Sequence, residues 1–162
     1  MKPEIITPAA CFRHLFSATR RGARLARHLT VHQLDEWGIA YGSDPSDRAE
    51  AIVAELAANA VAHGHVPGRC FEVRLTLTPH LLRIDVADAR TESLPQLAAQ
   101  PPSPEVESGR GLLLVDALAD RWSVHGRGLA PGKTVRAEVD LNPMQVTPMD
   151  ASDGGRRSPL LG

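Results

Sequence analysis

Cysteine is scarce in this chain of 162 residues, and long apolar runs are missing. The two cysteines, Cys11 and Cys70, do not form a closely spaced pair, so the sequence predicts neither a disulfide framework nor a cysteine-based metal site. No apolar run approaches the roughly 18 residues of a membrane span, and the first residues lack the apolar segment of a secretion signal. We therefore expect a cytoplasmic protein with reduced thiols and no membrane partner.

An excess of positive charge is missing as well. The chain has 18 Lys and Arg against 19 Asp and Glu, so its formal net charge is -1. Because proteins that bind nucleic acids usually carry a basic excess, nucleic acid is not an expected partner. The arginines do cluster near the start, at Arg13, Arg20, Arg21, Arg24 and Arg27. An organellar transit peptide and the solvated face of a helix both fit this cluster, and we favour the helix.

The composition is that of a soluble globular protein, with 43% apolar and 23% charged residues. The length suits one domain with a single core. Core-forming residues are sparse only at the two ends. We therefore expect a flexible arm over residues 1–10, one folded domain over 11–141 and a disordered tail over 142–162.

Hydrophobic periodicity divides the domain into helices and strands. Three segments have apolar residues at helical spacing, and four alternate apolar with polar residues as strands do. The expected helices are 19–37, a segment that follows the turn residues 42–47 and ends at Gly64, and 112–119; the expected strands are 71–78, 82–88, 121–126 and 133–141. The first two strands should pair as an antiparallel hairpin. This mixed order predicts an α/β layered fold with a mostly antiparallel sheet.

The second expected helix, which contains "AELAANAVAHG", carries an unusual polar stripe. Glu55, Asn59 and His63 stand four residues apart at the edge of the arc that should face the core. Burying such groups without partners is costly, so they need something to bind. One interpretation is structural: Glu55 pairs with an arginine and Asn59 bonds to nearby backbone. The other is a ligand, and the helix alone favours the structural interpretation.

Two features further along the chain favour the ligand. Asp88 shares the parity of the apolar Val86, so its carboxylate should face the core side where a long irregular segment begins. That segment ends at Gly109, Arg110 and Gly111, just before a helix whose free N–H groups and positive dipole end would suit an anion. The simpler alternatives are a strand that stops before Asp88 and a plain glycine-rich turn.

In this order, "ELAANAVAHG", "DVAD", "GRGLLLV" and "GKTVRAEV" resemble the N box and the glycine-associated boxes of the GHKL superfamily of ATPases. Within it, "GRGL…LVDALADRW" followed by "GKTV" most resembles the bacterial anti-sigma-factor serine kinases of the RsbW type. The resemblance covers roughly residues 10–141. It implies a Bergerat-type ATP-binding fold, an α/β two-layer sandwich whose mixed, mostly antiparallel sheet is covered on one face by helices.

The resemblance also implies binding of ATP and Mg²⁺ and assigns roles to residues. By similarity, Asn59 would ligate the Mg²⁺ and Glu55 would accept the proton of the attacking hydroxyl. Asp88 would accept a hydrogen bond from the adenine amino group, and Thr134 would contact the same base. Residues 89–110 would form the lid. The residues expected to bind the nucleotide are Asn59, Asp88, Gly109, Arg110, Gly111, Leu112 and Thr134.

The function implied is that of an anti-sigma factor with serine/threonine protein kinase activity. Such a protein would bind a sigma factor and phosphorylate an anti-sigma antagonist, and related proteins form homodimers. Two alternatives remain open: a non-catalytic, ATP-gated interaction module and a plain hydrolytic ATPase. The chain departs from the superfamily at Arg90 and Glu92, which stand where glycines are usual. His28 and His32 have a metal-binding spacing but lack a third ligand, so no metal site is expected there.

Overall fold

The computed structural model describes residues 10–62, 69–88, 108–127 and 130–142. The expected arm over 1–10 and tail over 142–162 lie almost entirely outside these residues, as does the expected lid up to residue 107. His63 lies outside them too. The described elements are β1 (Ala10–Ser17), α1 (Arg20–Glu36), α2 (Asp44–Ala62), β2 (Cys70–Leu77), β3 (Leu81–Asp88), α3 (Ser108–Leu118), β4 (Arg121–Arg127) and β5 (Ala130–Asp140).

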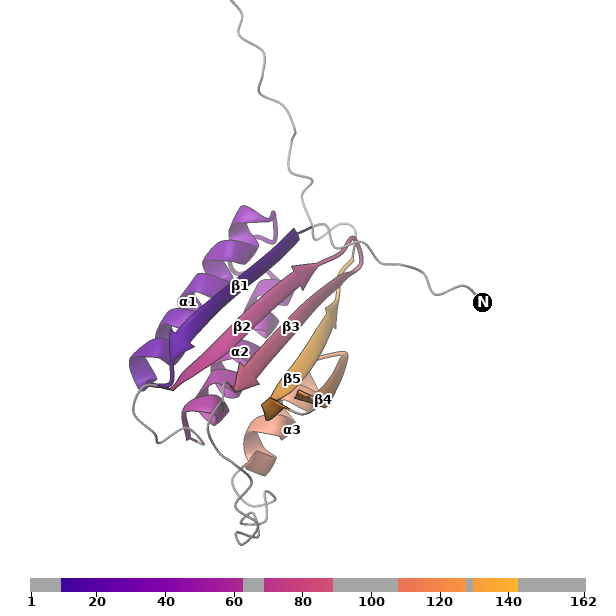
Figure 1. Cartoon of the computed structure of the whole chain (residues 1–162). Helices are drawn as coiled ribbons and strands as arrows, with labels where there is room; N and C mark the ends of the chain where they lie inside the picture. The colour runs from indigo at the N-terminus through magenta and orange to yellow at the C-terminus, as the bar shows by residue number, and fades with distance from the viewer. Residues whose placement is uncertain (1–9, 63–68, 89–107, 128–129, 143–162) are drawn as a thin grey trace, which may run out of the picture.

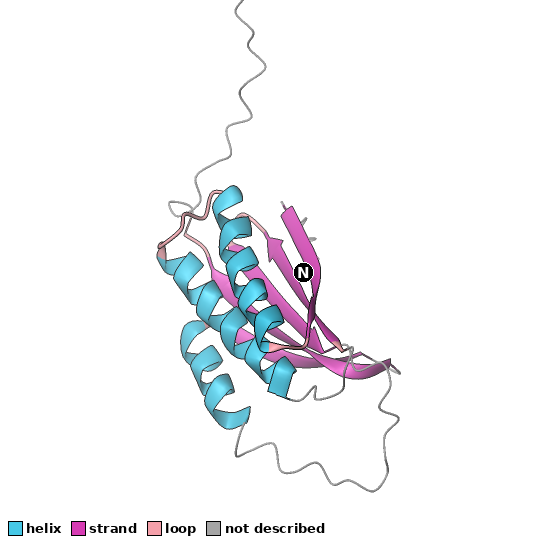
Figure 2. Cartoon of the chain, turned by 90° about the vertical axis from the view of Figure 1, so that its left-hand side faces the viewer, coloured by secondary structure: helices cyan, strands magenta, loops and turns pink. Residues whose placement is uncertain are grey.

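The described strands form one five-stranded sheet with the order β1-β2-β3-β5-β4. Each pair of neighbouring strands is antiparallel (Figure 1). The helices lie together on one side of this sheet, and the other side carries no helix of the described chain (Figure 2). The structure therefore confirms the predicted α/β two-layer sandwich, with a sheet that is antiparallel at every described pairing. None of the described helices has the combination of length and apolar character that a membrane crossing needs.

The strand β1 was not expected, since the sequence predicted a flexible arm over residues 1–10 and no strand directly after it. It pairs along its whole length with β2 at the edge of the sheet. An edge strand is half exposed, and here Arg13, His14 and Leu15 are all exposed, so the buried and exposed residues do not alternate regularly. This lack of alternation explains why the pattern was missed.

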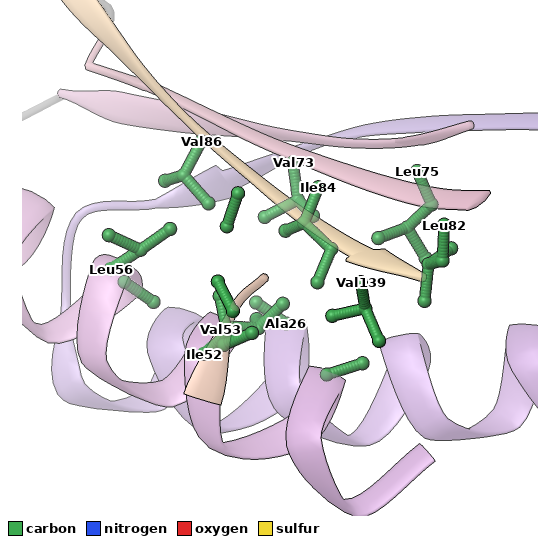
Figure 3. Packing of buried hydrophobic residues seen from close by; sticks show 14 of the residues in the cluster. Ala26, Ile52, Val53, Leu56, Val73, Leu75, Leu82, Ile84, Val86 and Val139 are labelled. Carbon is green, nitrogen blue, oxygen red and sulfur yellow. The ribbon is translucent and has the colours of Figure 1, made fainter. Parts of the chain in front are cut away.

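The core lies between the sheet and the helices, and α2 is its central helix. Ile52, Val53 and Leu56 point from α2 toward Ile84 and Val86 of the sheet (Figure 3). α2 contacts both other helices and three of the five strands. Its buried face also includes three alanines, Ala49, Ala57 and Ala60. Because alanine side chains are small, the backbone of α2 can lie close to its neighbours.

The sheet face turned away from the helices is covered by paired charges. Arg136 Nε donates to Asp85 Oδ1 at 2.8 Å, and Arg13 Nε donates to Glu72 Oε2 at 2.8 Å. The side chains of Asp85 and Glu72 are only 9% and 8% exposed, so the arginines supply the partners that buried carboxylates need. These ion pairs account for the polar side of the last expected strand, for which the sequence alone offered no reason.

The same face continues over β4 and β5. Arg121 hydrogen-bonds to Asp140, and this bond holds the pKa of the Asp140 carboxyl below its ordinary value. Arg121 also lies 3.4 Å from Glu138. A lowered folded-state pKa means that the pair contributes stability above the usual aspartate pKa and loses it as the pH falls through the lowered value. The contribution is small because both side chains are exposed.

The start of α1 is fixed to the end of β1 by a close contact. Thr19 is the N-cap of α1, and its Oγ1 accepts a hydrogen bond from the Gly22 N–H at 3.0 Å. Gly22 is buried, and a Cβ at this position would lie 1.9 Å from the Ser17 carbonyl oxygen. The approach of the two backbones therefore requires glycine at position 22.

Replacing Gly22 with alanine should destabilise the protein. Although alanine favours helix by about 1 kcal/mol, the clash with the Ser17 carbonyl must be relieved by a backbone shift, and we expect a net loss of about 2 kcal/mol. Chemical denaturation of Gly22→Ala measures this change in the free energy of unfolding. Gly126→Ala is the matched control, because a Cβ there meets nothing within 4 Å. Equal stabilities for the two variants would contradict the close contact.

Candidate functional site

A hollow opens between the helical layer and the sheet, where β3 ends. Its space amounts to about 510 Å³, part of which is open to solvent. The residues that line it are Leu56, Asn59 and Ala60 of α2, Val86 and Asp88 of β3, Leu112 of α3, Val124 of β4, and Lys133 and Val135 of β5.

The walls of the hollow are mostly apolar, and they come from both layers. Leu56 and Ala60 stand one helical turn apart on α2, and both are buried. Val86 and Val135 face them from paired positions of β3 and β5. Two facing apolar walls can hold a flat ring system between them, while the polar groups at the rim decide which ring is held.

Asp88 and Asn59 supply polar atoms to this apolar hollow. Asp88 is the last residue of β3 and lies on the same side of the strand as Val86, as its parity predicts. Asn59 lies on α2 between Leu56 and Ala60. Both side chains are half-buried. The structure thus brings together a helix amide and a strand-end carboxylate that are far apart in the sequence.

Glu55 is half-buried on α2, one turn before Asn59, and it is not among the residues that line the hollow. Neither side chain makes a hydrogen bond or an ion pair with any residue that the structure describes. The structural interpretation of the polar stripe needed an arginine for Glu55 and a backbone group for Asn59. Among the described residues the structure provides neither partner.

The helix α3 begins earlier than the sequence predicted. Gly109, Arg110 and Gly111 were expected in the turn before the helix, but α3 starts at Ser108 and includes all three in its first turn. The expected suitability for an anion is unchanged by this correction, because the N–H groups of a first turn have no partner within the helix. Leu112 follows directly and lines the hollow. The positive end of α3 therefore lies beside the hollow.

The far end of α3 is tied to α2 by Arg48. Arg48 Nε donates to the Leu118 carbonyl oxygen at 2.7 Å, and its Nη2 lies 3.3 Å from Asp120. Asp120 in turn accepts a hydrogen bond from the Asp140 N–H of β5 at 2.7 Å. Arg48 thereby satisfies a carbonyl group at the helix end that would otherwise lack a partner. The connection fixes α3 against both layers and so holds its first turn in place.

Thr134 is not among the residues that line the hollow. It lies on β5 opposite Ala87 and His125, and strand alternation turns its side chain to the face that Ala87 shares. Its neighbours Lys133 and Val135 line the hollow instead. The contact with the base that the resemblance implied for Thr134 thus stays a prediction. Its side chain is not brought to Asp88.

Several lining residues were not singled out from the sequence. Leu56 and Ala60 could have been found as the helical neighbours of Asn59, and Val86 as the residue of equal parity before Asp88. Val124 and Lys133 could not, because the pairing of β4 and β5 that places them there is a long-range property of the sheet. Lys133 is exposed and adds a cation to the rim.

The described chain is a single-sheet domain with three helices on one side of the sheet and a hollow between α2 and the end of β3 (Figure 2). Residues 16–139 match the family model of the histidine kinase-like ATPase domain. The match spans most of the chain, so the chain belongs to this family, and ATP binding follows from the membership. No curated protein matches the chain.

The residues of the hollow fit ATP. Apolar side chains from both layers match the faces of a purine, and the Asp88 carboxylate is an acceptor for the adenine amino group. The first-turn N–H groups of α3 suit phosphate. The Asn59 side-chain oxygen, on the same rim, is a ligand type that a hard cation accepts.

Removing the Asp88 carboxylate should weaken ATP binding. A hydrogen bond to a charged acceptor contributes about 1.5–3 kcal/mol, so Asp88→Ala should raise the Kd for ATP by about 10- to 100-fold. Titration calorimetry measures this change. Asp47→Ala, an exposed aspartate in the first turn of α2, is the control and should bind as the parent does. Parental affinity of Asp88→Ala would show that the base is not held here.

Proposed function

We propose that the protein is an anti-sigma factor with serine/threonine protein kinase activity, which binds a sigma factor and phosphorylates an anti-sigma antagonist. The observation that carries the proposal is the half-buried Glu55 carboxylate, which has no partner among the described residues and stands one turn from Asn59. A hydrolase or kinase needs such a proton acceptor near its phosphates. Membership of the ATPase family and the sequence motifs "GRGL" and "GKTV" support the same proposal.

Each residue of the site has a role in the proposed reaction. Asp88 selects the adenine base, and the first turn of α3 binds phosphate oxygens through its N–H groups. Asn59 would hold Mg²⁺, whose charge would offset that of the phosphates when it is bound. Glu55 takes the proton of the partner's serine hydroxyl.

The proposed transfer is a direct exchange between two oxygens at phosphorus. The serine oxygen forms a bond to the γ-phosphorus of ATP, and the bond from that phosphorus to the oxygen shared with the β-phosphate breaks. The hydroxyl proton passes to the Glu55 carboxylate. The products are phosphoserine on the antagonist and ADP. No oxidant or further reactant is needed.

A second candidate is an ATP-gated interaction module without kinase activity. It is favoured by the position of Glu55, which is not among the residues that line the hollow, and by Arg90 and Glu92 in place of the usual glycines. In such a module ATP would only stabilise one partner surface. A plain hydrolytic ATPase has less support, because a small single domain offers no evident use for the energy of steady hydrolysis.

The Glu55→Gln variant separates the two candidates. If Glu55 is the base, phosphate transfer should slow by about 10²- to 10⁴-fold while ATP affinity is retained. The measurement is transfer of labelled γ-phosphate to proteins that the wild type retains from the native cell in the presence of ATP. Glu50→Gln on the same helix is the control, since Glu50 instead lies 3.7 Å from Arg27. The module is favoured if the wild type transfers no phosphate and the Glu55→Gln variant still binds its partner proteins in an ATP-dependent way.

Asn59→Ala should remove the dependence of ATP binding on Mg²⁺. The parent should bind ATP more tightly with Mg²⁺ than with a chelator, because the cation joins the Asn59 oxygen to the phosphates. The variant should bind with equal affinity under both conditions. Asn59→Asp, which keeps an oxygen ligand, should retain the dependence. A metal effect of parental size in Asn59→Ala would place the cation elsewhere.

A further inference from the structure

The outer face of α1 carries arginines that make no ion pair or hydrogen bond with the described residues. Arg20, Arg21 and Arg24 are exposed in the first two turns, and none makes an ion pair or hydrogen bond with the residues that the structure describes. Arg27, one turn later, differs because it lies 3.7 Å from Glu50 of α2. Arg13 of the expected cluster lies on β1 and pairs with Glu72, whereas the rest of the cluster lies on α1, as the sequence suggested. Its charges, however, are not balanced there.

The placement of these charges opposes the helix dipole. The N-terminal end of a helix is positive and favours acidic residues, yet the first turn of α1 has none and contains arginines. The C-terminal end is negative, and there α1 carries Asp35 and Glu36 and no basic residue. In contrast, α2 has Asp44 and Asp47 in its first turn. Since stability favours the arrangement of α2, stability cannot explain that of α1.

The first turn of α1, which bears the arginines, is held by contacts with neighbouring backbone. The contact of Gly22 with Ser17 and the Thr19 cap fix the first turn. The Ala18 N–H also donates to the Arg69 carbonyl oxygen at 2.8 Å, which brings a further arginine next to the start of α1. A surface that is already fixed loses little conformational entropy when it binds.

An apolar side chain lies among the cations. Leu25 is 48% exposed, and it stands one turn from both Arg21 and His28 on the outer face of the helix. We call these residues the α1 patch: Arg20, Arg21, Arg24, Leu25 and His28. The patch is separate from the hollow, because α2 lies between α1 and α3 and contacts both (Figure 1).

We propose that the α1 patch is a docking surface for an acidic segment of a partner protein. Carboxylates of the segment pair with the three arginines, and one of its apolar side chains covers Leu25. A phosphate polymer or an anionic membrane fits less well, because either would extend along α1 and meet the negative charges of Asp35 and Glu36 at its other end. The patch does not depend on whether the partner is phosphorylated.

The test uses a display library of random peptides about four helical turns long, selected for binding to the full-length protein. The selected peptides should be rich in Asp and Glu and contain an apolar residue. Their affinity should fall about tenfold in the Arg20→Gln/Arg21→Gln/Arg24→Gln variant, as expected for the loss of three exposed ion pairs, and should also fall as salt is added. Leu25→Ala should weaken the same peptides.

Three further measurements complete the test. The triple variant should keep the parental affinity for ATP and an equal or higher Tm, because charges that oppose the helix dipole are gone. A lower Tm would give the arginines a structural role and overturn the proposal. The proposal is also overturned if the selected peptides lack acidic residues, if they bind the triple variant as tightly as the parent, or if no peptides are selected. If a single-stranded oligonucleotide or phosphatidylglycerol vesicles bind through these arginines and acidic peptides do not, the proposal is wrong. The α1 patch would then bind a nucleic acid or a membrane and not an acidic protein segment. If the parent protein does not bind ATP, the proposed kinase activity is wrong, but the proposal for the α1 patch still stands.

Discussion

The close packing of α2 against the sheet is the constraint on which the other features depend. Three buried alanines let the helix backbone approach β3 and β5, while Leu56 fills the space near the strand ends. This approach sets Asn59 across from Asp88, and the hollow is the gap that remains where α2 ends. Arg48 of the same helix holds α3 by its C-terminal end. One helix thus packs against the core, supplies Leu56, Asn59 and Ala60 to the wall of the hollow, and holds α3.

The polar groups of the molecule fall into two kinds. On the open sheet face almost every charge has a partner, as Arg136 has in Asp85. Glu55 and Asn59 at the site and Arg24 on α1 have none among the described residues. Unpaired groups cost stability or gain nothing from the fold, so they point to ligands and partners outside the chain. The paired face, by contrast, needs no partner, since its charges are already satisfied.

Sequence patterns were most informative where a segment has one buried face. α2 and the β2–β3 hairpin were predicted closely, and the parity of Asp88 correctly placed it beside Val86. Patterns failed where the answer depends on distant partners. β1 exists because β2 offers it an edge, and Lys133 reaches the hollow because β5 lies between β3 and β4. The start of α3 was missed because glycines usually end a helical pattern, whereas a first turn tolerates them.

The most direct test of an adenine site at Asp88 is a calorimetric comparison of ATP with GTP in the presence of Mg²⁺. Adenine presents an amino group where guanine presents a carbonyl, and a carboxylate attracts the first and repels the second. The structure therefore predicts that ATP binds the protein and that GTP binds at least about tenfold more weakly. Absence of ATP binding, or equal affinities for the two nucleotides, would contradict this site.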